Sequence, residues 1–129
     1  MVIDTSALVA IFLGEAERKP FLDHILQAET KLLSAANSLE TGIVLEARRG
    51  EAVGREFDLF IVRTKIEIVP VDAEQSEIAR SAWRKYGKGR HAAGLNFGDC
   101  FAYALAKSTG QELLAKGEDF RFTDLELAP

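Results

Sequence analysis

Apolar residues along this chain fall into short continuous runs separated by longer segments with a different spacing. The runs are rich in Val, Ile and Leu and have the length of buried strands. They cover Val2 to Asp4, Lys31 to Ala35, Ile66 to Val71 and Glu112 to Lys116, and a weaker fifth run, DLELA, lies near the C-terminus. These segments are predicted to be the strands of the fold.

The longer segments between the runs carry apolar residues at helical spacing, which predicts amphipathic helices. The spaced residues are Leu39, Ile43, Val44 and Ala47; Phe57, Phe60 and Ile61; Ile78, Ala82, Trp83 and Tyr86; and Phe101, Ala104 and Leu105. Strands that alternate with helices predict an α/β fold with a mainly parallel central sheet and helices on both faces, because parallel neighbours need crossover connections.

Composition agrees with this fold prediction and indicates the number of domains and the compartment. The chain has 129 residues, 47% hydrophobic and 28% charged, which predicts a single globular domain over residues 1–129. An apolar strand beginning at Val2 and the absence of a long apolar run predict a cytoplasmic protein. The lone cysteine, Cys100, cannot form an internal disulfide and is expected in the core.

Four acidic residues lie where the predicted strands end or a helix begins. Asp4 ends the first strand, Glu40 lies five residues beyond the second, and Asp119 lies three residues beyond the ELLAK strand. Asp99 begins the final long helix. Ligands of open α/β sheets bind outside the carboxyl ends of the strands, so these four carboxylates are expected to converge at one edge.

Each acid also has a purely structural interpretation. Asn37 with Glu40, and Asn96 with Asp99, have capping-box spacing, so both acids are also candidates for first-turn residues of helices. Asp4 is a candidate cap for a helix that begins near Thr5, and Asp119 for an ordinary turn residue.

The four acids together favour a metal site. Two unit charges about 4 Å apart repel by roughly 4 kcal/mol at an effective dielectric constant near 20, so a fold that gathers carboxylates needs a counter-charge. Oxygen ligands suit Mg²⁺ or Mn²⁺, and His24 and His91 lack the spacing of a zinc site.

A carboxylate-held Mg²⁺ or Mn²⁺ typically serves phosphodiester hydrolysis. Asp4 and Asp99 are the expected direct ligands, and Glu40 and Asp119 are expected to bind through water or to complete a second site. Thr5 or Ser6 is expected to orient water or a carboxylate.

The chain is acidic overall, with a net charge of −4, but it contains one basic segment, RSAWRKYGKGRH. The cations of this segment, here called the basic cluster, are Arg80, Arg84, Lys85, Lys88 and Arg90. The cluster is predicted either to contact an RNA backbone or to form an ordinary solvated face. Trp83 and Tyr86, at helical spacing, are expected to be core or partly buried residues rather than base-stacking ones.

The segments MVIDTSAL, SLETGIVLEAR, YGKGRHAAGLNFGDCFAYALAK and LLAKGEDFRFTDL resemble the PIN domain of VapC-type toxins, the ribonuclease halves of bacterial toxin–antitoxin pairs. The resemblance implies a three-layer α/β/α sandwich and a Mg²⁺- or Mn²⁺-dependent endoribonuclease. Asp4, Glu40, Asp99 and Asp119 match the acidic positions of the family, and the motif favours Asp119 over its neighbour Glu118.

The resemblance also implies partners. These are an RNA substrate, a VapB-type antitoxin whose C-terminal segment enters the active-site groove, and a second copy of the chain in a homodimer. The helices between Leu39 and Phe60 offer an apolar surface for such contacts.

Two alternatives remain open from the sequence. One is a PIN-like RNA-binding module without catalysis, which the presence of all four acids disfavours. The other is a phosphoacceptor receiver domain, which fits less well because the run Ile66 to Val71 leads only to Asp72 at the start of a helix.

Overall fold

Four parallel strands form the centre of the computed structural model, which describes residues 1–129. They are β1 (Val2–Ile3), β2 (Leu32–Ser34), β3 (Glu67–Val69) and β4 (Leu113–Leu114), in the order β3-β2-β1-β4. Val2 pairs with Leu32 on one side and with Leu113 on the other, and Leu32 pairs with Glu67. The four strand predictions are confirmed, and the weaker fifth run contributes a single bridge from Leu127 to Leu113.

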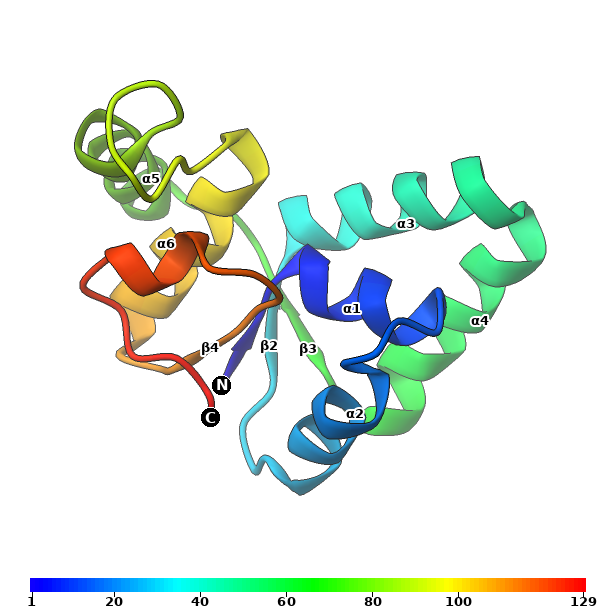
Figure 1. Ribbon diagram of the computed structural model, residues 1–129. Coiled ribbons are helices and arrows are strands. Elements are labelled where there is room, and N and C mark those ends of the chain that lie inside the picture. The colour runs from blue at the N-terminus through cyan, green and yellow to red at the C-terminus, as the bar shows by residue number, and fades with distance from the viewer.

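Helices cover both faces of this sheet, as Figure 1 shows. On one face lie α1 (Thr5–Phe12), α2 (Arg18–Gln27), α3 (Ala35–Arg49) and α4 (Glu51–Thr64), and on the other lie α5 (Ala73–Tyr86) and α6 (Phe97–Thr109). The predicted three-layer α/β/α architecture is confirmed.

Successive strand residues point to opposite faces, which explains why the strands are continuous apolar runs. Val2, Leu32 and Leu113 belong to the core cluster beneath α5 and α6. Ile3, Leu33 and Leu114 belong to the cluster beneath α1 and α4. Both sets of side chains are therefore removed from water.

The structure shows which faces of α3 and α5 point inward. On α3 the buried residues are Asn37, Thr41 and Leu45, so Leu39 and Ile43 are 65% and 59% exposed, in agreement with the apolar surface expected on these helices. On α5, Tyr86 is buried as expected, and Trp83, which is 46% exposed, is only partly buried. Helical spacing thus identified the helices correctly but left the inward face of α3 open.

The lone cysteine and the lengths of the helices agree with the sequence analysis. Cys100 is a buried free thiol, as predicted, and burial raises its pKa to about 11. None of the helices combines the length and the apolar character needed to cross a bilayer.

Candidate active site

Asp4 lies at the carboxyl end of β1, where the chain turns into α1. It is the N-cap of that helix, and its Oδ2 accepts a hydrogen bond from the Ser6 amide at 3.0 Å. The other oxygen, Oδ1, is buried and has no hydrogen-bond partner. Burial raises the pKa of the Asp4 carboxyl, and the nearby charge of Glu40 raises it further. The capping interpretation is therefore correct but accounts for only one of the two oxygens.

Glu40 extends toward Asp4 from α3 and is held by two hydrogen bonds. Its Oε1 accepts from the Thr5 hydroxyl at 2.6 Å and from Asn37 Nδ2 at 3.2 Å. The capping-box interpretation of this pair is wrong, because α3 begins three residues earlier than the spacing suggested, with Ser34 as its N-cap. Asn37 instead positions the Glu40 carboxylate.

The first turn of α6 closes on Glu40 from the opposite side. Asn37 Nδ2 also donates to the Gly98 carbonyl at 3.0 Å, which links α3 to α6. A Cβ atom at Gly98 would lie 2.3 Å from Glu40 Oε2, closer than any real contact allows. Glycine at position 98 therefore lets the Glu40 carboxylate lie against the first turn of α6 in its present place.

The sequence interpretation assigned no role to Gly98 and only a capping role to Asn37. A glycine inside the first turn of a helix is the signal that could have indicated Gly98, because glycine disfavours helices unless another group must approach closely. The link from Asn37 to α6 has no such signal.

Asp99 follows Gly98 and forms the predicted capping box with Asn96. The Asp99 amide donates to Asn96 Oδ1 at 2.9 Å, and Asp99 Oδ2 accepts from the Asn96 amide at 3.0 Å. The pKa of this carboxyl is raised to about 7. Partial burial is the main cause, and the charges of Asp4, Asp119 and Glu40 raise it further, while the hydrogen bond from the Asn96 amide lowers it. The capping residue thus lies within electrostatic reach of the other three acids.

Asp119 is the first residue of a short 3₁₀ helix, η1 (Asp119–Phe122), that follows β4. Its side chain is exposed, while the next residue, Phe120, is buried and anchors the helix. Neighbouring Glu118 pairs with Arg121 at 3.1 Å. This pairing favours Asp119 as the acid available to the site.

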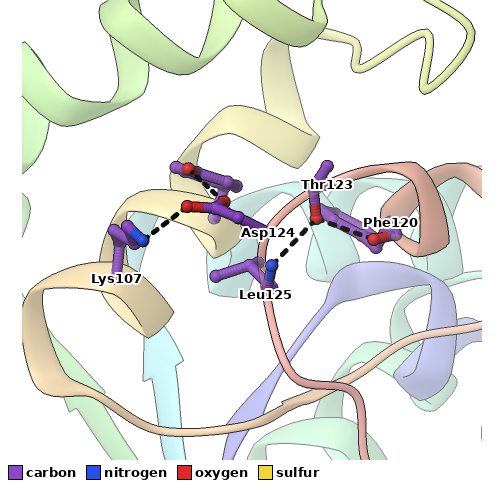
Figure 2. Close-up of polar contacts among 6 residues, drawn as sticks. Lys107, Phe120, Thr123, Asp124 and Leu125 are labelled. Carbon is purple, nitrogen blue, oxygen red and sulfur yellow. Dashed lines mark hydrogen bonds and ion pairs between the residues drawn. The ribbon is translucent and has the colours of Figure 1, made fainter.

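The chain around η1 is fastened to the rest of the protein on both sides. Before η1, the Lys116 amide donates to Ser6 Oγ at 2.9 Å. After it, Asp124 accepts from Tyr103 at 2.7 Å and from Lys107 at 2.5 Å, both on α6. Figure 2 shows Asp124 between α6 and the Thr123 turn, whose hydroxyl donates to the Phe120 carbonyl. Ser6 thus has a positioning role in joining β4 to α1.

The arrangement suits a hard divalent cation, although it is not a ready-made cage. No group of three or more His, Cys, Asp or Glu side chains is arranged to hold a metal ion as the structure stands. However, Asp4 offers a buried oxygen without a partner, and the charges of Asp4, Asp119 and Glu40 all act on Asp99. Carboxylates supplemented by water are the ligands that Mg²⁺ prefers.

Without divalent metal, the protein is expected to lose stability as the pH rises. The pKa of Asp99 is about 7 in the folded state against an ordinary value of 3.8. Because the folded pKa is the higher one, this contribution to stability is complete below about pH 4 and is lost as the pH rises through about 7. Thermal unfolding in chelator across this range should show a falling midpoint, with a shallower fall for Asp99→Asn. Equal slopes for the two proteins would contradict the assigned burial.

The basic cluster lies on α5 and the loop after it, and all five of its side chains are exposed. None of them pairs with a carboxylate within 4.0 Å. The Arg90 guanidinium lies over the Trp83 ring, 4.7 Å from its centroid. These cations are therefore free to meet a polyanion, and their contact with RNA stays a prediction.

Comparisons with known proteins identify the family of this chain. A family model described as PIN domain matches residues 1–125. Ribonuclease VapC of Mycolicibacterium smegmatis is 54% identical over 125 residues, which are 97% of each chain. Ribonuclease VapC30 of Mycobacterium tuberculosis is also 54% identical, over 97% of this chain and 95% of its own.

Solved structures agree at the level of the fold. VapC20 of Mycobacterium tuberculosis, a toxin that cleaves the sarcin–ricin loop, aligns with a TM-score of 0.79 at 21% identity over 99% of this chain and 98% of its own. A toxin–antitoxin complex from Klebsiella pneumoniae aligns with a TM-score of 0.73 at 19% identity, over 99% of this chain and 96% of the matched chain.

Proposed function

The chain belongs to the PIN-domain family and, within it, to the VapC ribonuclease toxins of toxin–antitoxin systems, and from this membership we propose a divalent-metal-dependent endoribonuclease. Its proposed catalytic site is the acidic edge formed by Asp4, Glu40, Asp99 and Asp119. One feature of this edge supports the proposal most strongly. The charges of Asp4, Glu40 and Asp119 help to raise the pKa of Asp99, and Oδ1 of Asp4, at the end of β1, is buried without a hydrogen-bond partner.

The proposed roles of the acids follow from their surroundings. Asp4 and Asp99 are the proposed direct ligands of Mg²⁺ or Mn²⁺, and a divalent cation there would lower the pKa of bound water and neutralise charge on the phosphate. Thr5 and Asn37 hold Glu40 in one orientation by hydrogen bonds. Exposed Asp119 completes the site from η1, through water or a second ion.

Three partners are proposed: RNA as the substrate, a VapB-type antitoxin and a second copy of the chain. One of the structural neighbours is VapBC2 of Rickettsia felis bound to a DNA fragment from its promoter, with a TM-score of 0.75 at 15% identity. In this chain, α3 and α4 expose Leu39, Ile43, Leu59 and Val62. These exposed apolar side chains are the proposed contacts for protein partners, because burying them against a partner would remove apolar surface from water.

Incubation of the purified protein with total RNA tests the proposed function. Discrete fragments in Mg²⁺ or Mn²⁺, absent with chelator and with Asp4→Asn, are the expected result. Cleavage that persists in chelator would contradict the metal site. Binding of RNA without any cleavage would favour the silent binding module instead.

The basic cluster gives a separate prediction about binding. Lys88→Ala combined with Arg90→Ala should weaken RNA binding and lower the salt dependence, because fewer phosphate contacts release fewer counterions. Two lost contacts should reduce the slope of log K against log salt by about 1.4 for a single strand. Titrations at several salt concentrations measure this slope.

The matched control removes the same number of cations elsewhere. Lys19→Ala combined with Arg63→Ala changes two exposed residues on α2 and α4. The control slope should stay close to that of the wild type. If both double variants change the slope equally, only net charge matters and the basic cluster is a solvated face.

A further inference from the structure

A cavity of about 510 Å³ opens between α5 and the first turn of α6. Its apolar wall includes Trp83, Leu95, Phe97 and Phe101. Figure 1 shows that α5, the loop after it and the start of α6 lie together on one side of the sheet. None of the four acids of the proposed catalytic site lines this cavity.

The cavity adjoins the acidic edge through α6. Asn96 and Cys100 line it, and between them in sequence lies Asp99. A ligand in the cavity would therefore lie beside the helical turn that carries a proposed metal ligand.

Trp83 is a half-exposed aromatic wall that is packed against the loop after α5. The Arg90 guanidinium lies over one face of its ring, 4.7 Å from the centroid. A Cβ atom at Gly87 would lie 2.8 Å from Trp83 Cδ1 and 2.3 Å from its carbonyl oxygen, so the loop packs directly against this residue. A wall held in this way loses little conformational entropy when a flat ligand stacks on it.

The charged residues that line the cavity are both cations, Arg80 and Lys88. Neither pairs with a carboxylate. An aromatic wall beside unpaired cations complements an unpaired nucleotide, whose base stacks while its phosphates meet the positive charges. The same rim disfavours a second copy of the chain, since a twofold contact would bring like charges together.

We propose that this cavity binds one unpaired base of the RNA beside the cleaved bond, with Trp83 as the stacking wall and Arg80 and Lys88 on its phosphates. The inference rests on the proposed function and deepens it, because the cavity would make cleavage depend on RNA conformation around the bond.

The single tryptophan of the chain gives a readout that needs no catalysis. Asp99→Asn protein in chelator is titrated with short single-stranded RNA homopolymers and with an abasic ribose-phosphate chain of equal length. The bases should quench Trp83 fluorescence, and the abasic chain, with the same phosphates, should not. Equal effects of the two chains, or none, would overturn the proposal.

Cleavage kinetics test the same cavity in the active protein. In an oligonucleotide that spans a mapped cleavage site, one abasic position should lower kcat/KM on the order of tenfold, as expected for one lost stacking contact. Trp83→Ala should lower kcat/KM on intact RNA by a similar factor. On the abasic RNA, the same substitution should lower kcat/KM little further. Trp83→Phe should retain most of the activity. Leu26→Ala, which changes an exposed apolar residue on α2, is the control.

The outcomes separate the two proposals. Quenching by bases without any cleavage overturns the proposed function and leaves the cavity as a nucleotide site. Cleavage that is insensitive to every abasic position overturns the proposed base-binding role of the cavity and leaves the proposed ribonuclease function intact. A Trp83→Ala protein with a changed oligomeric mass but unchanged base dependence would assign this face to a second copy.

Discussion

Asp99→Asn is expected to lower the rate of RNA cleavage by at least about a hundredfold, beyond the range for removing an outer-shell partner of a metal ligand. The change removes one negative charge with little change in volume. The asparagine side chain can still accept the Asn96 amide, so the capping box and the fold should survive. Initial cleavage rates together with circular dichroism measure both effects.

The control for this variant is Asp58→Asn, the same chemical change at an exposed position of α4. It should leave the cleavage rate unchanged. Asp4→Asn should match Asp99→Asn in lost activity, because both carboxylates are proposed to bind the same metal. Full activity in either variant would show that the substituted residue is not a ligand of the catalytic metal.

Gly98→Ala is expected to reduce cleavage on the order of a hundredfold, because a misplacement of about 1 Å at a reacting site has effects of this size. The added Cβ would lie 2.3 Å from Glu40 Oε2 and would displace the carboxylate from its place beside Thr5 and Asn37. The conflicting atom is the end of a flexible side chain. The protein should therefore remain folded while the site is disturbed.

Gly42→Ala provides the matched control in α3. A Cβ atom there meets nothing within 4 Å, so the substitution should leave activity unchanged and should stabilise the helix by about 1 kcal/mol. Cleavage rates and thermal midpoints of the two variants distinguish the cases. An active Gly98→Ala protein would show that the Glu40 position has no importance for catalysis.

The sequence was sufficient to predict the sheet, because continuous apolar runs have one simple explanation in a chain of this length. It also led to the expectation that acids meet at one edge, since parallel strands share a carboxyl edge. Asp4 lies at the end of β1, whereas Asp99 lies in the first turn of α6. In the structure, both have carboxyl pKa values raised by burial and by neighbouring acids.

Periodicity could not predict which face of α3 points inward. The buried face near the site carries the polar Asn37 and Thr41, while Leu39 and Ile43 point to solvent. A polar face is buried here because its groups bond one another and α6: Asn37 Nδ2 reaches the Gly98 carbonyl, and Thr41 donates to the Asn37 carbonyl at 2.7 Å. Such pairings depend on tertiary contacts between helices far apart in the sequence.

The same limit explains why the exact burial of Trp83 could not be predicted. Its helical spacing favoured a core or partly buried position, and in the structure the loop after α5 folds back so that Gly87 and Arg90 pack against the side chain. Gly98 likewise acquires its importance only when α3 and α6 meet. These residues lie where separate elements come together, which spacing within one element does not report.

Anomalous diffraction from a crystal grown with Mn²⁺ is the most direct test of the acidic edge. A peak is expected between the carboxylates of Asp4 and Asp99, with Glu40 and Asp119 facing it directly or through water. A Mn²⁺ peak elsewhere on the protein, or none at this edge at a pH where Asp99 is ionised, would contradict a metal-dependent catalytic site formed by these four residues.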